Sequence, residues 1–407
     1  MRFHGEAHRD FKPDWLPTPV PRKVALVAAG MSRFGTRPET PKQLFDEAWR
    51  EMAGRVRGTW DGRVDEAWIG TVGFGGHQPG NSAALFLQGT PSQGAGAHRV
   101  ENACASSGFA IRDAFLAIRA GAADVALAAG VESMTPFSKA HRGSWLGVSG
   151  DTEVERASGL TFPGVYALMA RAHMAQFGTT REHLAHVAVK NHANGAHNPH
   201  AQFQKPTTLE KALAAAMVAD PLGLFDCCST TDGAATALLV AEERVPEFTD
   251  HPIWLLGSGV ATDTLALHDR KEWTGMAATR VAAAHALTQA QRQVAELDFA
   301  EVHDCFTIAE VMATEDLGLV AKGQGGPAVA AGRTAIGGDL CAVNPSGGLK
   351  AKGHPLGATG AGQAVEVFEQ LRGLAGGRQV KDAKLALTHN VGGSGATCAV
   401  HVWEAGQ

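Results

Sequence analysis

Short apolar runs alternate along the chain with amphipathic segments and small-residue turns. Apolar runs typical of buried strands lie within residues 23–35, 64–76, 123–133, 233–243, 252–263, 299–307 and 383–395. Several of these runs end in glycines, as a strand does when it passes into a loop. Because strand-like and helix-like segments alternate, the pattern favours an α/β fold in which helices cover a mostly parallel sheet.

Three segments carry apolar residues at helical spacing. They cover residues 40–56, 100–121 and 360–373. In the first segment Thr40 stands at the N-cap position and Pro41 at the first helical position, which predicts where that helix begins. The second segment repeats Ile111, Phe115 and Ile118 at i, i+4 and i+7. This spacing predicts a helix with one buried face.

Between residues 134 and 231 the pattern changes to mainly helical segments with many histidines, which indicates an insertion. The last elements of the chain repeat the order of the opening ones, so the two halves resemble an internal duplication. The expected division is an N-terminal extension (1–22), an N-terminal half (23–133 and 232–250), an inserted loop domain (134–231) and a C-terminal half (251–407). In such a duplication the turns around Cys104 and His354 occupy related places at strand ends, where α/β sheets collect ligands.

Composition and charge exclude several classes of function. The 407 residues include 36 basic and 41 acidic side chains, and no basic run suggests a nucleic-acid partner. The six cysteines are irregularly spaced, which favours neither a disulfide framework nor a structural metal. The N-terminal stretch is charged and proline-rich, and no apolar run is long enough to cross a membrane. We therefore expect a cytoplasmic protein that binds neither nucleic acid nor membrane.

The stretch "NACASSG" places Cys104 just before a predicted helix. In one interpretation Asn102, Ser106 or Ser107 caps the helix and the cysteine only fills space. In the other, the positive end of the helix lowers the pKa of the thiol and makes it a nucleophile. For this stretch taken alone, the space-filling interpretation is favoured, so the case for a nucleophile depends on the rest of the chain.

Three further small-residue stretches carry reactive groups. In "EVHDCF", His303 and Cys305 would project from one face of a strand, although a buried pair without chemistry fits equally well. His354 is held between a glycine and a proline, as in many simple turns. Gly392 and Gly393 offer free backbone N–H groups suited to an oxyanion. Together these groups supply a nucleophile, a base, an acid and an oxyanion hole.

The motifs "NACASSG", "DGAAT", "NPSGG" and "GHPLGATG" resemble those of the thiolase superfamily, in this order and across nearly the whole chain. Many thiolases have an Asn-Glu-Ala-Phe motif where this chain has "HDCF", and a Cys-x-Gly motif where it has Asn390-Val391-Gly392. Both departures are similar to the sterol-carrier-protein-2 type of thiolase, here expected without an appended lipid-carrier domain. The resemblance implies two duplicated βαβαβ-type halves that form a five-layered α-β-α-β-α core.

The resemblance also implies roles for the reactive groups. Cys104 would accept the acyl group, and His354 would activate it. His303 would join His354 in one oxyanion hole, and the N–H groups of Cys104 and Gly392 would form the other. Cys305 would move the proton during carbon–carbon bond making or breaking, because position 390 carries an asparagine in place of a cysteine.

The implied reaction is reversible: a 3-ketoacyl-CoA is cleaved by CoA, or two acyl-CoAs are condensed. CoA and acyl-CoA would be substrates held by residues 134–231, with no permanently bound cofactor and no metal. The histidines of this region are expected on solvated helix faces or in CoA contacts: His173, His183, His186, His192, His197 and His200. The cysteines expected to be core residues are Cys227, Cys228, Cys341 and Cys398.

Three alternatives share the fold. One is a retro-aldolase that acts on CoA-linked sterol side chains with an OB-fold partner, although such enzymes lack the nucleophilic cysteine. A second is an acetoacetyl-CoA thiolase in a complex with a hydroxymethylglutaryl-CoA synthase and a small zinc/OB-fold protein. A third is a non-catalytic acyl-CoA-binding scaffold. The family resemblance also implies a homodimer or homotetramer.

Overall fold

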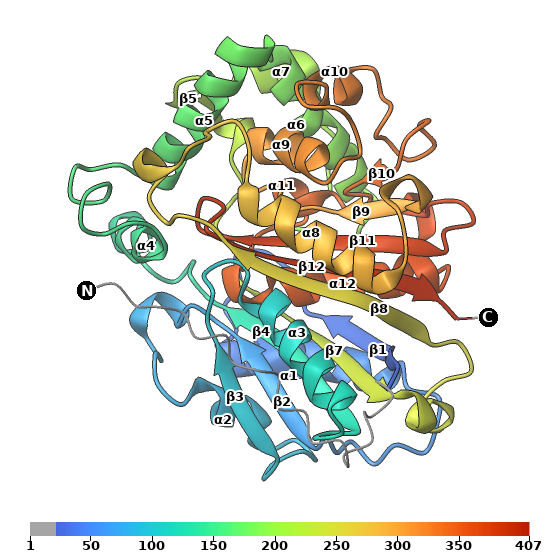
Figure 1. Ribbon diagram of the computed structural model, residues 1–407. Coiled ribbons are helices and arrows are strands. Elements are labelled where there is room, and N and C mark those ends of the chain that lie inside the picture. The colour runs from blue at the N-terminus through green and yellow to red at the C-terminus, as the bar shows by residue number, and fades with distance from the viewer. Residues whose placement is uncertain (1–21, 407) are drawn as a thin grey trace, which may run out of the picture.

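The computed structural model describes residues 22–406, and ten strands in this part form one sheet (Figure 1). The strands are β1 (Val24–Met31), β2 (Glu66–Gly70), β3 (Gly96–Val100), β4 (Val125–Glu132), β7 (Gly233–Ala241), β8 (Ile253–Thr262), β9 (Phe299–Glu301), β10 (Ala342–Val343), β11 (Leu385–Gly392) and β12 (Thr397–Ala405). A separate small hairpin joins β5 (Met217–Ala219) and β6 (Leu222–Gly223). Except for Arg22, the predicted N-terminal extension lies outside the described residues.

The strand order confirms the duplication. The sheet runs β10-β9-β11-β12-β8-β1-β7-β4-β2-β3. Counted from either outer edge of the sheet towards its middle, the strands are the third, second, fourth, fifth and first of their half in chain order. Within the sheet, the two halves are joined where β1 pairs with β8, at Ala25↔Trp254 and Leu26↔Ile253.

The expectation of a mostly parallel sheet is wrong. The fifth strand of each half, β7 or β12, runs antiparallel to both of its neighbours, and β1 and β8 are also antiparallel. The short turn between β11 and β12 allows only an antiparallel return. Parallel pairing is confined to the outer strands, such as β2 with β3 and β4, or β9 with β10 and β11. A run of apolar residues shows that a strand is buried but not in which direction it runs.

Helices cover both faces of each half of the sheet. They are α1 (Pro41–Gly54), α2 (Ser82–Leu87), α3 (Ser106–Arg119), α4 (Lys139–Leu146), α5 (Phe162–Phe177), α6 (Arg181–Gly195), α7 (Leu209–Leu213), α8 (Ala277–Ala290), α9 (Thr307–Asp316), α10 (Gly325–Ala330), α11 (Gly348–Ala351) and α12 (Thr359–Leu371). The predicted start of α1 is confirmed, because Thr40 and Gln43 form a capping box and Pro41 opens the helix.

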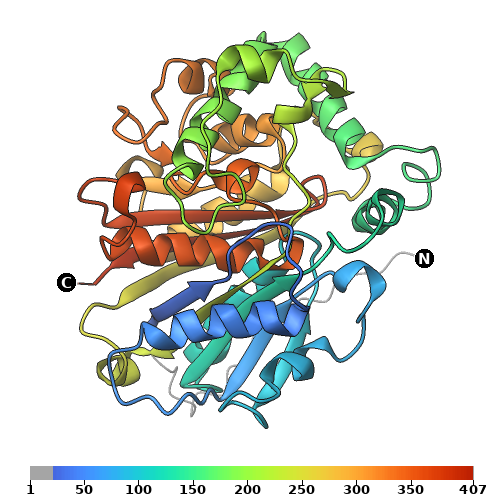
Figure 2. The same cartoon turned by 180° about the vertical axis from the view of Figure 1, so that it is seen from behind.

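The helices and strands form five layers. Helices α3 and α12 pack together in the middle, where their apolar faces share one core with strands of both halves. On the outer side of the N-terminal half, α1 and α2 cover the sheet, and α8 covers β8 and β12 on the opposite outer side. Figure 2 shows α1 in blue on the outer face of the N-terminal half, and α12 in red-orange between the two halves. The predicted α-β-α-β-α layering is confirmed.

The region between β4 and β7 contains α4 to α7 and the small hairpin. Its green helices α5, α6 and α7 lie beside α9 and α10 at the top of Figure 1, and α6 contacts α9, α10 and α11. The region thus packs on the C-terminal half. Among residues 22–406, every helix is too short or too polar to cross a lipid bilayer.

Several histidines of this region are not on solvated faces, so that expectation is wrong for them. His173 is fully buried, with its Nε2 2.9 Å from the carboxylate of Glu315. His192 is also buried. His200 has its Nε2 3.3 Å from Glu51 and 3.7 Å from Glu369. His173 and His200 thus pair with carboxylates outside the inserted region, whereas Nδ1 of His192 lies 3.3 Å from the Lys205 carbonyl oxygen within it.

The ion pairs of His200 predict a loss of stability at alkaline pH. Burial lowers the pKa of His200, but hydrogen bonds to Glu369 and Glu51 outweigh it and raise the pKa to about 9. In the unfolded chain the pKa is about 6.5. The charged form therefore stabilises the fold fully below about pH 6.5, and this contribution, on the order of 3 kcal/mol, is lost as the pH rises through 9. Thermal unfolding followed from pH 6.5 to 9.5 should show a falling Tm. His200→Gln should have a lower Tm at pH 7 and a flatter profile; an unchanged slope in this variant would contradict the assignment.

Candidate active site

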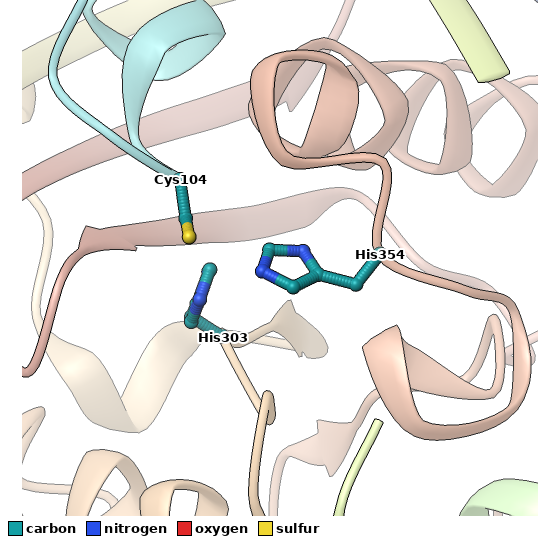
Figure 3. A group of neighbouring side chains, drawn as sticks. All are labelled: Cys104, His303 and His354. Atoms are coloured by element: carbon teal, nitrogen blue, oxygen red, sulfur yellow. The ribbon is translucent and has the colours of Figure 1, made fainter. Parts of the chain in front are cut away.

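Cys104, His303 and His354 meet at one point between the two halves. The thiol sulfur and one nitrogen of each imidazole all lie within 4.8 Å of one another (Figure 3). Cys104 comes from the turn before α3, His303 from the loop after β9, and His354 from the turn before α12. The imidazole rings are 4.9 Å apart between centroids and nearly perpendicular. The duplication thus brings together three side chains that are far apart in the sequence.

The turn that presents Cys104 is strained and held by polar contacts. Ala103 has a φ of 50°, a left-handed value that is unfavourable for a residue with a Cβ. The Ser106 hydroxyl accepts a hydrogen bond from Asn102 N–H at 3.0 Å and donates one to the Ala103 carbonyl at 2.6 Å. The Ser107 hydroxyl accepts from the N–H of Ala361 on α12. The interpretation in which Asn102, Ser106 or Ser107 caps the helix is therefore wrong, because α3 lacks a side-chain cap. The two serines instead hold the turn and join the central helices.

Burial, and not the helix end, dominates the acidity of Cys104. Burial raises the pKa of its thiol well above the usual range, and the neighbouring Cys228 raises it further. A backbone hydrogen bond from Gly393 lowers the pKa, but less. The interpretation in which the helix end lowers this pKa is therefore wrong. Removing the thiolate from water raises the pKa by more than the partial charge of the helix end can lower it. The thiol is protonated at neutral pH and needs a base.

The hydrogen bonds of His354 make it such a base. Its Nδ1 lies 2.7 Å from the Thr359 hydroxyl, which itself donates to the Pro355 carbonyl at 3.2 Å. Since that hydroxyl proton is already used, Thr359 accepts from Nδ1–H, and the lone pair of the ring is on Nε2. Burial lowers the pKa of His354 to about 3, so the ring is neutral. A neutral imidazole with a free Nε2 lone pair can accept the proton of a thiol.

The strand expected to carry His303 and Cys305 is shorter than predicted. β9 ends at Glu301, so both side chains lie in the loop that follows. Cys305 is 5 % exposed; burial raises the pKa of its thiol, and a hydrogen bond with Tyr166 lowers it. Tyr166, from α5, also donates to the Gly393 carbonyl at 3.1 Å and stacks on Phe306. The sequence offered no motif for this tyrosine, although it is the only one in the chain.

The predicted glycines lie directly against the Cys104 turn. A Cβ at Gly392 would lie 2.3 Å from the Asn102 carbonyl oxygen, so only glycine fits there. Gly393 follows with a φ of 64°, and its backbone is the group that lowers the pKa of the Cys104 thiol by hydrogen bonding. The end of β11 is therefore part of the same site.

Two other residues lie in the site without having been assigned a role from the sequence. Asn390 has its side-chain nitrogen 2.9 Å from the Cys104 carbonyl oxygen and 3.2 Å from Nδ1 of His303. Cys228, expected to be a core residue, is half-buried, and its N–H donates to the Cys305 carbonyl at 2.9 Å. Of the other cysteines, Cys398 is fully buried, as expected.

Comparison with known proteins places this constellation in a family. Residues 24–243 match the family described as "Thiolase, N-terminal domain", and residues 259–405 match "Thiolase C-terminal domain-like". The chain is 43% identical over 393 residues to an acetyl-CoA acetyltransferase of Methanothermobacter thermautotrophicus, covering 94% of this chain and 99% of that one. It is 34% identical over 402 residues to human sterol carrier protein 2, covering 94% of this chain and 72% of the other.

A solved structure has the same fold at low sequence identity. The structure described as "Ltp2-ChsH2(DUF35) aldolase" has a TM-score of 0.82 at 22% identity, covering 95% of this chain and 99% of that one. This likeness concerns the fold alone. The two matching domains and the full-length similarity to acetyltransferases show that the chain belongs to the thiolase family and is an acyltransferase.

Proposed function

We propose that this protein is a thiolase that cleaves 3-ketoacyl-CoA with CoA, or condenses acyl-CoAs, through an acyl group on Cys104. The observation that carries the proposal is the meeting of the Cys104 thiol with two neutral imidazoles of His303 and His354 within 4.8 Å. The acetyl-CoA acetyltransferase at 43% identity supports CoA thioesters as the substrates.

The first step is the transfer of an acyl group to Cys104. His354 Nε2 takes the thiol proton, and the thiolate attacks the 3-keto carbon of the substrate. The N–H groups of Cys104 and Gly392 stabilise the resulting oxyanion. When the carbonyl re-forms, the bond between carbons 2 and 3 breaks, and its electron pair passes to carbon 2 as an acetyl-CoA enolate.

The second step returns a proton to carbon 2. His303 and His354 hold the enolate oxygen, and the Cys305 thiol gives its proton to carbon 2, which releases acetyl-CoA. Burial keeps Cys305 protonated at neutral pH and therefore ready to act as this acid. The thiol of CoA then returns a proton to Cys305, and its sulfur attacks the acyl group on Cys104 to form the shortened acyl-CoA. The Cys104 thiolate leaves as the thioester forms and takes back the proton held by His354, which restores the site. Condensation is the same sequence in reverse.

CoA is assigned to residues 134–231. In support, Tyr166 of this region reaches the site and contacts Gly393 and Phe306. The homodimer or homotetramer and the accessory protein remain predictions from the family resemblance.

A second candidate is a retro-aldolase that works with an OB-fold partner. It is favoured by the likeness to the Ltp2–ChsH2(DUF35) aldolase, which concerns the fold alone. The chain keeps Cys104 and Cys305, which a retro-aldol cleavage does not need and acyl transfer does. An acetoacetyl-CoA thiolase in a larger complex would use the same residues as the main proposal.

A thiolysis assay separates these functions. With 3-ketoacyl-CoAs of several chain lengths, we expect cleavage to acetyl-CoA and a shortened acyl-CoA only when free CoA is present, measured by chromatography of the CoA thioesters. Cleavage of 3-hydroxyacyl-CoAs without free CoA would favour the retro-aldolase. Tight binding without turnover of either substrate would favour the acyl-CoA-binding scaffold.

A further inference from the structure

Asn390 is fixed in one orientation by two backbone groups. It is 1 % exposed, at the end of β11. Its side-chain oxygen accepts a hydrogen bond from Gly108 N–H at 3.2 Å, and its Nδ2 donates to the Cys104 carbonyl at 2.9 Å. An N–H group can only donate and a carbonyl can only accept, so exchanging the oxygen and nitrogen of the amide would break both bonds. The second hydrogen of Nδ2 points to His303.

This orientation determines which nitrogen of His303 carries the proton. Nδ1 lies 3.2 Å from Nδ2 of Asn390, which is a donor, so Nδ1 must be the acceptor. Burial lowers the pKa of His303 well below its usual range, so the ring is neutral and carries one hydrogen. That hydrogen is on Nε2. Among residues 22–406 this Nε2 has no hydrogen-bond partner although it is buried, as expected of a donor that awaits a substrate oxygen.

The two histidines of the site therefore present opposite groups. Thr359 holds His354 with a lone pair on Nε2, whereas Asn390 holds His303 with a hydrogen on Nε2. One ring is prepared to accept the proton of Cys104 and the other to donate a hydrogen bond. Neutral imidazoles placed 4.9 Å apart would otherwise be free to exchange these roles.

The same contact opposes metal binding. One thiolate and two imidazoles within 4.8 Å of one another are a typical ligand set for Zn²⁺. A metal requires a lone pair on the coordinating nitrogen of each ring. To supply one from Nε2, His303 would have to move its hydrogen to Nδ1, where it would meet the N–H of Asn390. Zinc-binding histidines instead have an acceptor, such as a carboxylate, on this second nitrogen.

We propose that Asn390 is a positioning residue that holds His303 as the Nε2–H tautomer, so that the site donates a hydrogen bond to the thioester oxygen and does not chelate a divalent metal. The catalytic half of this proposal rests on the proposed thiolase function; the tautomer and the metal preference do not. Asn390 occupies the position at which many thiolases carry a cysteine, and here it serves the histidine of the "HDCF" motif.

The test compares Asn390→Asp with Asn390→Ala. Aspartate keeps the shape of the side chain but accepts from His303, which should move the hydrogen to Nδ1. We expect the aspartate variant to lose roughly 10²–10³-fold in kcat, as for a lost oxyanion donor. It should bind Co²⁺ roughly 10- to 100-fold more tightly than the native protein, with the thiolate-to-cobalt charge-transfer band as the readout. Alanine leaves the tautomer free and should lose less activity. The matched control is Asn194→Asp. Asn194 is half-buried, lies outside the site and donates a hydrogen bond from Nδ2 to the Asn344 carbonyl.

Nitrogen NMR of ¹⁵N-histidine-labelled protein reads the tautomer directly, with His303→Gln to assign the signal. We expect Nε2–H in the native protein. A native Nδ1–H tautomer would overturn the proposal, as would an alanine variant that loses at least as much activity as the aspartate variant, since that order indicates simple anchoring of the turn. If the native protein shows Nε2–H but does not perform thiolysis, the proposed function fails and the tautomer assignment stands.

Discussion

Cys104→Ala is expected to lower kcat for thiolysis by roughly 10⁴-fold or more, because the step that forms the acyl-enzyme has no other nucleophile. His354 would remain as a base without a thiol to activate. The rate of 3-ketoacyl-CoA consumption is measured in a quenched assay, and the affinity for CoA is measured by calorimetry. Together the two measurements distinguish loss of chemistry from loss of binding.

The matched control is Cys341→Ala, which removes a half-buried thiol that precedes β10 and has no part in the proposed reaction. This variant should keep the native kcat. A Cys104→Ala protein with more than about a hundredth of the native rate would contradict the nucleophile assignment, since residual catalysis from binding alone is far smaller.

Cys305→Ala is expected to separate the two halves of the reaction. Without its acid, the enolate cannot be protonated, so thiolysis and condensation should fall by roughly 10²–10⁴-fold. Acylation of Cys104 by acetyl-CoA still has His354 and the oxyanion hole, and it should continue because the CoA thiolate is a good leaving group that can take its proton from water when Cys305 is absent. The measurement pairs steady-state thiolysis with rapid-quench detection of the acyl-enzyme.

If Cys305→Ala loses thiolysis and acylation of Cys104 to the same extent, Cys305 supports the site as a whole. If the variant keeps the native rate of thiolysis, another group moves the proton. Cys228 is the nearest alternative, because its backbone pairs with Cys305. A Cys228→Ala protein tested beside Cys305→Ala shows which thiol is required.

The reactive residues could be predicted from the sequence because they lie in short stretches whose motifs resemble those of the thiolase superfamily. Cys104 and His354 occupy equivalent turns of a duplicated fold, and His303 follows an apolar strand. Their pKa values could not be predicted in this way. The sequence shows a helix end beside Cys104, but only the structure shows that burial raises the pKa of the thiol by more than the neighbouring backbone lowers it.

Asn390 and Tyr166 could not be identified from local patterns, because their functions depend on distant partners. Asn390 contacts a residue 286 positions away and another 87 positions away. Tyr166 comes from the inserted region and meets the end of β11, 227 positions away. Contacts of this kind depend on the topology of the fold, and the periodicity of a single helix or strand carries no information about topology.

The fold was predicted best where elements are amphipathic. Helices α1, α3 and α12 have one apolar face each, and α1 also has its capping box. The edge strand β3 was not predicted because most of it is exposed and polar. Helix α8 was not predicted because its buried face is made mainly of alanines, which give little contrast with the rest of the helix.

The central claim, an acyl group on Cys104, is tested most directly by peptide mass spectrometry. After brief incubation with acetyl-CoA and acid quenching, the native protein should carry one acetyl group, on the peptide that contains Cys104. The adduct should persist in Cys305→Ala and disappear when free CoA is added. An adduct on another residue, or none in active native protein, would contradict the account.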